Sequence, residues 1–215
     1  MDKKQAVEPR HPTVAVSDSF MAASAWYAAM SASSEVTRLG FIMMGTACCC
    51  GVLRFGFLPE VFRPYNEVFA KAAGQIGLPL VGFGFLNNGT VAGYTSETIS
   101  STTFMFALVM LFCAFLPQKE GVVELYTKVC GVAAMACIFT SNASYTLHDM
   151  YSSREKWGVV LFTLGGIVIG QDRERCMFGV RRENLFHYTL AIAIYLFTTG
   201  ARCSENNGSC DAVWF

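Results

Sequence analysis

The sequence is poor in charge, and its charges favour neither sign. Charged residues make up 15% of the 215 residues, and 16 lysines and arginines balance 16 aspartates and glutamates. A chain without a basic excess has no net attraction for a polyanion, which excludes nucleic acid as an expected partner. Hydrophobic residues account for 53% of the chain, more than a soluble domain needs. We therefore expect the lipid bilayer to be its main partner, with other membrane proteins as further candidates.

Sequence motifs for several kinds of chemistry are also missing. No GxxxxGK[ST] phosphate-binding loop occurs. Only three histidines are present, and a predicted span at 157–170 separates His148 and Asp149 from His187, so these groups do not form one metal site. The first residues lack the compact apolar region of a cleaved signal peptide. We expect no catalytic residue, no metal and no cofactor, and we expect the first span to direct insertion.

Long apolar blocks are what the sequence has in abundance. About 20 helical residues cross the hydrocarbon core of a bilayer, and six blocks have roughly this length. A seventh block, 13–33, is long enough but carries Asp18 and several serines, so it is either a span or an interfacial helix. The sequence predicts an all-α, polytopic transmembrane bundle of seven spans, with six spans plus an interfacial helix as the alternative. The six clear blocks are 39–58, 69–86, 99–116, 122–141, 157–170 and 185–201.

The distribution of basic residues predicts the orientation of these spans. With seven spans and a cytoplasmic N-terminus, twelve of the 16 lysines and arginines face the cytoplasm, as the positive-inside rule requires. Six spans would move Lys3, Lys4 and Arg10 to the outer side. We therefore expect a cytoplasmic tail at 1–12, a transmembrane domain at 13–202 and a lumenal or extracellular tail at 203–215.

Glycosylation sequons and two cysteines agree with this orientation. The sequons at Asn88, Asn142 and Asn207 all fall on the predicted outer side, and Asn207 is the most accessible candidate. Cys203 and Cys210 lie close together in the outer tail, where oxidising conditions favour a disulfide. These features suggest a membrane of the eukaryotic secretory pathway, either the endoplasmic reticulum or the plasma membrane.

Two helical hairpins have similar sequences. FLPEVFRPYNEVFAKAAG begins at Phe57 and FLPQKEGVVELYTKVCG at Phe115, and with one gap both contain a Glu followed four residues later by a Lys. A weaker third copy has His in place of Lys. Duplication and convergent turn chemistry are both open explanations. The paired positions are Glu67 with Lys71, Glu124 with Lys128, and Glu183 with His187.

These pairs have a structural and a functional interpretation. A Glu in the first turn of a helix, with Lys at i+4, stabilises the helix and anchors it at the membrane interface. Alternatively, Lys71, Lys128 and His187 meet in an inner vestibule, with their Glu partners beside them. Gln75 and Asp18 would add polarity to such a vestibule. An ionisable residue inside a span is by default a functional candidate, although the sequence shows no partner for Asp18.

The sequence leaves two classes of function open. Short loops favour action within the bilayer, so the first expectation is a non-enzymatic protein. Such a protein would bind or move a small or lipid-like ligand, or serve as a subunit of a membrane complex. The alternative is an intramembrane lipid-modifying enzyme that uses Asp18, His187 and nearby Ser or Tyr residues.

Overall fold

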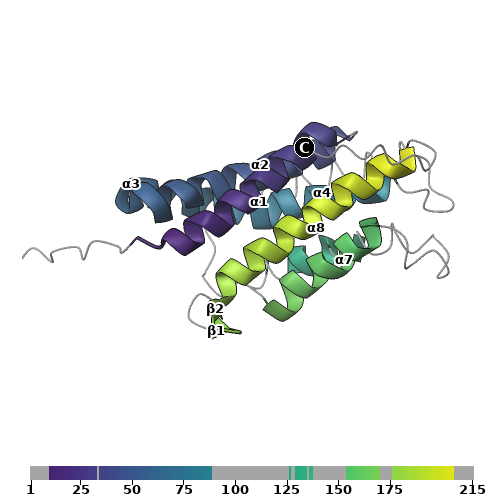
Figure 1. The fold of residues 1–215 in the computed structure, drawn as a ribbon. Coiled ribbons are helices and arrows are strands. Elements are labelled where there is room, and N and C mark those ends of the chain that lie inside the picture. Colours follow the sequence, from purple (N-terminus) through teal and green to yellow (C-terminus); the bar gives the residue numbers. More distant parts are fainter. Residues whose placement is uncertain are drawn as a thin grey trace, which may run out of the picture.

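The structure is a computed structural model that describes residues 10–32, 34–88, 126, 129–134, 136–137, 154–169 and 176–205. Almost all of these residues are helical, as the predicted all-α class requires (Figure 1). The predicted span 99–116 lies outside the described residues, as does most of 122–141. The helices are α1 (Pro12–Ser31), α2 (Glu35–Val52), α3 (Pro59–Ala72), α4 (Leu78–Asn88), α7 (Arg154–Thr163) and α8 (Arg182–Glu205), with π-helical segments η1 (Leu53–Phe57), η2 (Ala73–Gly77) and η4 (Leu164–Ile169).

The predicted loop between the first two clear blocks is helical instead. Helix α3 begins at Pro59 and continues through η2 into α4, so the helical run starts ten residues before the predicted block 69–86. The two prolines and the charges of this segment suggested a loop. Pro59 is nevertheless well suited to the first turn of a helix, where its missing N–H would have no partner, whereas Pro64 lies inside α3 and does not end it.

One helical segment of the described residues is long and apolar enough to cross a membrane. This segment is Glu35–Phe57, which comprises α2 and η1, and Trp157–Gly166 is a shorter apolar helix. Helices α1 and α8 have 20 and 24 residues, but neither contains a stretch apolar enough to count as a candidate span. By length and composition, the described part of the chain therefore contains one candidate span.

Helix α1 lies between α2 and α8, while α7 packs on α8, and α3 and α4 pack on α2 (Figure 1). The first residues of α1 lie beside the end of η1, because the His11 N–H donates to the Phe55 carbonyl at 2.9 Å. Helices α1 and α8 begin at the same end of the bundle. His11 lies 3.2 Å from Arg181 at that end, and the Tyr27 and Tyr195 rings pack 6.1 Å apart further along. Neighbouring α1 and α2 are thus antiparallel, and α1 and α8 are parallel.

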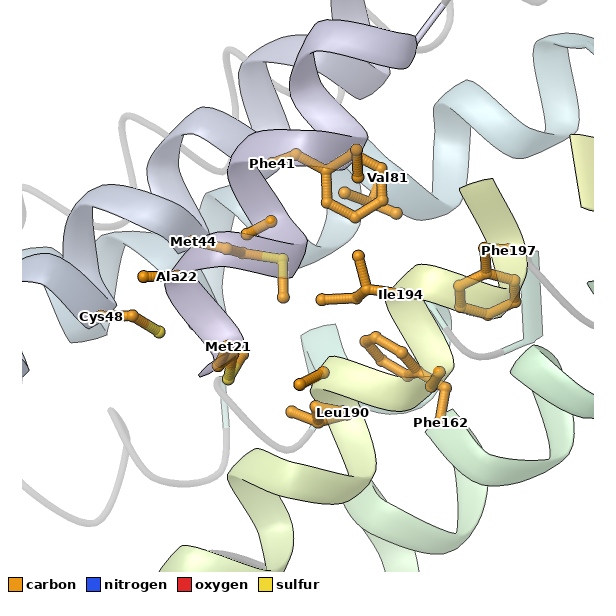
Figure 2. Close-up of a cluster of buried hydrophobic side chains, with 14 of the residues drawn as sticks. Met21, Ala22, Phe41, Met44, Cys48, Val81, Phe162, Leu190, Ile194 and Phe197 are labelled. Atoms are coloured by element: carbon orange, nitrogen blue, oxygen red, sulfur yellow. The ribbon is translucent and has the colours of Figure 1, made fainter. Parts of the chain in front are cut away.

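Small residues allow these helices to approach closely around one hydrophobic core (Figure 2). On α1, Met21, Ala22, Ala25 and Ala29 repeat at helical spacing and are buried, so this face packs against its neighbours. A Cβ on Gly40 would lie 2.6 Å from the Gly77 carbonyl oxygen, so α2 and η2 pack backbone against backbone. The larger core side chains are Phe41, Met44, Val81, Phe162, Leu190, Ile194 and Phe197.

A short hairpin precedes α8, which the sequence analysis did not predict. Strands β1 (Cys176–Met177) and β2 (Val180–Arg181) pair antiparallel. The two residues between them, Phe178 and Gly179, have φ angles of 54° and 77°. Positive φ at both central residues is the feature of a type I′ turn, which matches the twist of a two-stranded ribbon.

Candidate functional site

Polar side chains are buried where α1 crosses α8 and where α1 meets α2. On α1, Ser17 and Asp18 precede the apolar face formed by Met21 and Ala22, so they point into the same interface. Buried polar groups are costly unless they find hydrogen-bond partners, which makes their partners informative. We call the following residues the polar cluster: Ser17, Asp18, Arg54, Asn66, Asn184 and His187.

The closest contact in the polar cluster joins α1 to α8. Asp18 Oδ1 lies 2.7 Å from His187 Nδ1, and the two side chains are only 5% and 13% exposed. The helices bring them together because α1 and α8 run parallel, and because His187 shares one face of α8 with Asn184, Ala191 and Ile194. Asp18 therefore has the partner that the sequence could not identify.

Ser17 completes the α1 side of this contact. Its hydroxyl lies 2.9 Å from the Val14 carbonyl oxygen, 3.3 Å from His187 Nδ1 and 3.5 Å from Asn184 Oδ1. Ser17 and Asp18 thus approach the same imidazole nitrogen. A serine nucleophile activated by histidine needs the other nitrogen, with the carboxylate on the opposite side of the ring. The arrangement is therefore not a Ser-His-Asp catalytic relay.

The other polar atom of each partner remains open. Neither Asp18 Oδ2 nor His187 Nε2 makes a hydrogen bond with any described residue. Both atoms belong to side chains that are almost entirely removed from solvent. Within the described part of the chain, one hydrogen-bonding position on the carboxylate and one on the ring are therefore without a partner.

Gly51 of α2 faces the open side of the Asp18 carboxylate. A Cβ on Gly51 would overlap Asp18 Oδ2, and the same point lies 3.4 Å from Asn66 Nδ2. Cys48, one turn earlier on α2, is also close enough to Asp18 for the two side chains to interact electrostatically. Asp18 on α1 and Asn66 on α3 thus approach the same side of α2. Only a residue without a side chain fits at position 51 between them.

Arg54 and Asn66 extend the cluster towards the protein surface. Arg54 Nη1 donates to Asn66 Oδ1 at 3.0 Å, and Asn66 Nδ2 donates to the Ala47 carbonyl at 3.4 Å. The Arg54 guanidinium also lies 3.9 Å from Glu67, whose side chain is half exposed. Polar contacts therefore run from Glu67 at the surface to Asn66 in the interior, and Asn66 and Asp18 both face Gly51.

Comparisons with protein-family models, with curated proteins and with solved structures found no match. The site is therefore interpreted from its own geometry. Among the described residues, no three His, Cys, Asp or Glu side chains come together as a metal site.

The structure brings some predicted site residues together and leaves others apart. Asp18 and His187 are in contact, and Glu183 is buried one turn before His187 in the first turn of α8. Gln75 is buried in η2. Lys71 is exposed in the last turn of α3.

The predicted role of Glu67 at a helix start is wrong. Since α3 begins at Pro59, Glu67 lies in its third turn, and Glu60 occupies the first. Among the described residues, Glu67 pairs with Arg63 at 3.0 Å and not with Lys71. The proline-containing segment that was interpreted as a loop is the physical reason for the error.

Several predicted residues lie outside the described part of the chain. These are Glu124, Lys128, Asn142, Asn207 and Cys210, and with them the second copy of the proposed repeat. Helix α4 ends at Asn88, and α8 continues to Glu205, so Cys203 stands on the last turn of that helix. The disulfide and glycosylation predictions stay predictions.

The sequence analysis missed four members of the polar cluster. Ser17 and Asn184 could have been predicted from the sequence. Each is a polar residue on the same helical face as a candidate residue, Asp18 for Ser17 and His187 for Asn184. Arg54 and Asn66 had no such signal, because Arg54 lies near the end of the predicted span 39–58 and Asn66 in the predicted loop after it. Only the close approach of α3 to α2 explains their burial.

Proposed function

We propose that this chain is a multi-pass membrane protein that binds or moves a small ligand at a polar site inside its helical bundle, without chemical conversion of that ligand. The observation that carries the proposal is the 2.7 Å contact between Asp18 and His187. Ionisable side chains inside a membrane bundle are expensive, face the bundle interior and mark ligand or ion pathways. The open Asp18 Oδ2 and His187 Nε2 are the atoms available to such a ligand.

The seven-span arrangement is part of the proposal, and helix direction supports it. Seven spans require the first and the seventh to run the same way and the second to run against the first. Helices α1 and α8 are parallel and α2 is antiparallel to α1, as the hydrogen bond from His11 to Phe55 indicates. Helix α1 is also packed between α2 and α8, which favours a span over a helix lying on the bundle surface.

A tag at the N-terminus tests the orientation. In sealed microsomes with their cytoplasmic face outwards, we expect protease to remove an N-terminal tag and to leave a C-terminal tag intact. A protected N-terminal tag would contradict the seven-span topology and favour six spans.

Cys48 offers a native reporter for access to the site, because it lies beside Asp18. In a variant whose other cysteines are changed to alanine, we expect a small charged methanethiosulfonate reagent to modify Cys48 in intact membranes. The cysteine-free chain is the matched control. If Cys48 reacts only after the membrane is dissolved in denaturing detergent, water does not reach the cluster and the role as a ligand site fails.

A lipid-modifying enzyme is the second candidate, favoured by one observation: the Nε2 atom of His187 is open and could act as a general base on water. The shared contact of Ser17 and Asp18 with Nδ1 argues against a serine nucleophile. Incubation of the reconstituted protein with labelled phospholipid and sphingolipid mixtures, followed by chromatography, tests this candidate. A product that disappears in His187→Gln would favour the enzyme over the binding protein.

A further inference from the structure

The space immediately around the Asp18–His187 contact leaves little room for a ligand of several atoms. A methyl group on Gly51 would already overlap the Asp18 carboxylate, and the Ser17 hydroxyl occupies the space beside His187 Nδ1. The carboxylate is therefore held between α2 and α8 by direct contact. A species that uses the open Asp18 Oδ2 must be very small.

Charged and titratable groups lie on each element packed against α1. Cys48 on α2 and His187 on α8 interact with Asp18 itself, and Arg54 on η1 and Glu183 on α8 are also buried. The Arg54 guanidinium is bonded to Asn66 and lies 3.9 Å from Glu67, so its charge has a carboxylate of its own. The Asp18–His187 pair is thus the place in the cluster where a carboxylate and an imidazole are in direct buried contact.

From these contacts, and resting on the proposed function, we infer that the ligand of the site is the proton. The Asp18–His187 pair takes up a proton and releases it, and Gly51 holds the carboxylate in position for this exchange. Protons need no cavity beyond hydrogen-bonding groups or water, and the Asp18 carboxylate faces the same side of α2 as the buried Asn66 amide. Histidine is the side chain whose charge changes most readily near neutral pH, and carboxylate–histidine relays are typical of proton pathways in membranes.

In the proposed proton exchange, Asp18 starts as a carboxylate and His187 as an imidazolium. Transfer of the proton on His187 Nε2 to a water molecule breaks that N–H bond, forms hydronium and leaves a neutral ring beside the carboxylate. A hydronium ion from the other side of the membrane gives a proton to Asp18 Oδ2, which forms an O–H bond there and leaves water. Rotation of the ring then brings its proton-free nitrogen to the carboxylic acid, which transfers the proton and becomes a carboxylate again.

Proton movement in liposomes tests this inference. The full chain is reconstituted into liposomes that contain a pH-sensitive dye, and a potassium diffusion potential set with valinomycin drives proton entry. We expect acidification roughly tenfold or more above that of protein-free liposomes, as expected when a positioned acid–base pair assists transfer. Asp18→Asn and His187→Gln should return the rate to the protein-free level.

Gly51→Ala, with Gly166→Ala as its matched control, tests the role of Gly51. A Cβ at Gly51 meets Asp18, whereas a Cβ at Gly166 meets nothing within 4 Å. We expect Gly51→Ala to lose most of the proton flux and Gly166→Ala to keep it, because only the methyl group at position 51 would meet the Asp18 carboxylate. Equal rates in the two variants would remove Gly51 from the mechanism.

The wild-type measurement decides the inference even where a variant fails to fold. A wild-type rate equal to that of protein-free liposomes overturns the inference. If Cys48 is nevertheless reached by the charged reagent, the proposed ligand site stands and only its assignment to the proton fails. If Cys48 is also unreactive, both fail together.

Discussion

Asp18 on the first helix and His187 on the last make a buried contact of 2.7 Å, although they stand near opposite ends of the chain. The contact ties α1 to α8 in parallel register, with Ser17 and Asn184 beside it. It is both the candidate site and a structural connection between the two ends of the described bundle. The effect of this contact on stability can be measured by unfolding, separately from its role in function.

Removal of one partner of this contact should destabilise the protein more than removal of both. Asp18→Ala leaves His187 buried without its carboxylate, and we expect a loss of about 3 kcal/mol in the free energy of unfolding. Replacement of both residues by leucine should recover part of this loss, because no polar group is then left unpaired. Unfolding in mixed micelles, followed by circular dichroism, measures each variant.

Ser19→Ala is the matched control for this series. Ser19 also lies on α1, but its hydroxyl bonds only to the Ala15 carbonyl of the same helix at 2.8 Å. We expect a change within about 0.5 kcal/mol. A double leucine variant less stable than Asp18→Ala would contradict the interpretation.

Close packing of α2 on α4 predicts a rescue between Gly84 and Thr37. A Cβ on Gly84 would overlap the Thr37 side chain, so Gly84→Ala should cost about 1–3 kcal/mol. The Thr37 hydroxyl is buried and makes no hydrogen bond with the described residues, so Thr37→Ala should be nearly neutral and should make room for the new methyl group. The double variant is therefore expected to be more stable than Gly84→Ala alone in thermal unfolding. Additive losses would contradict this contact.

The buried and exposed ends of the Arg54 network should respond differently. Asn66→Ala removes the 3.0 Å hydrogen bond to the buried Arg54 guanidinium, and we expect a loss of about 1.5–3 kcal/mol. Arg63→Ala removes the 3.0 Å pair with Glu67, which is exposed, and should cost less than about 1 kcal/mol. Chemical denaturation of the two variants in parallel tests the difference. Similar losses would indicate that Asn66 is not buried as the structure has it.

The hairpin before α8 depends on positive φ at two positions. Phe178 is 92% exposed and adopts a φ of 54°, which asparagine tolerates better than phenylalanine. We expect Phe178→Asn to retain or strengthen the hairpin, and Gly179→Val to weaken it by roughly 1 kcal/mol or more. Hydrogen exchange of the amide groups of Val180 and Arg181 reports on both variants. Faster exchange in Phe178→Asn would contradict the assigned turn.

Helix content was predictable because it depends on local pattern. Apolar blocks of about 20 residues gave the approximate positions of α2, α4, α7 and α8, since a helix satisfies its own backbone hydrogen bonds. Boundaries were less predictable. Prolines and charges suggested a loop at 59–68, but a proline in the first turn is compatible with a helix, and α3 is helical there.

Individual ionisable residues were predictable as candidates, whereas their partners were not. Asp18 and His187 stood out because they interrupt apolar helices. The expected grouping of His187 with Lys71 came from sequence spacing alone, and Lys71 is exposed on α3. Sequence spacing describes which residues share a face of one helix, but it carries no information on which helix that face will meet.

The sequence by itself determined that this protein is helical and apolar, and that a few charged residues must lie within its helices. These properties follow from composition and from periodicity along one chain segment. Only the tertiary structure decided that Asp18 meets His187, that Gly51 lets Asp18 and Asn66 approach the same side of α2, and that Arg54 is buried. Such contacts depend on the direction and register of helices that are far apart in the sequence, and packing of whole faces sets both.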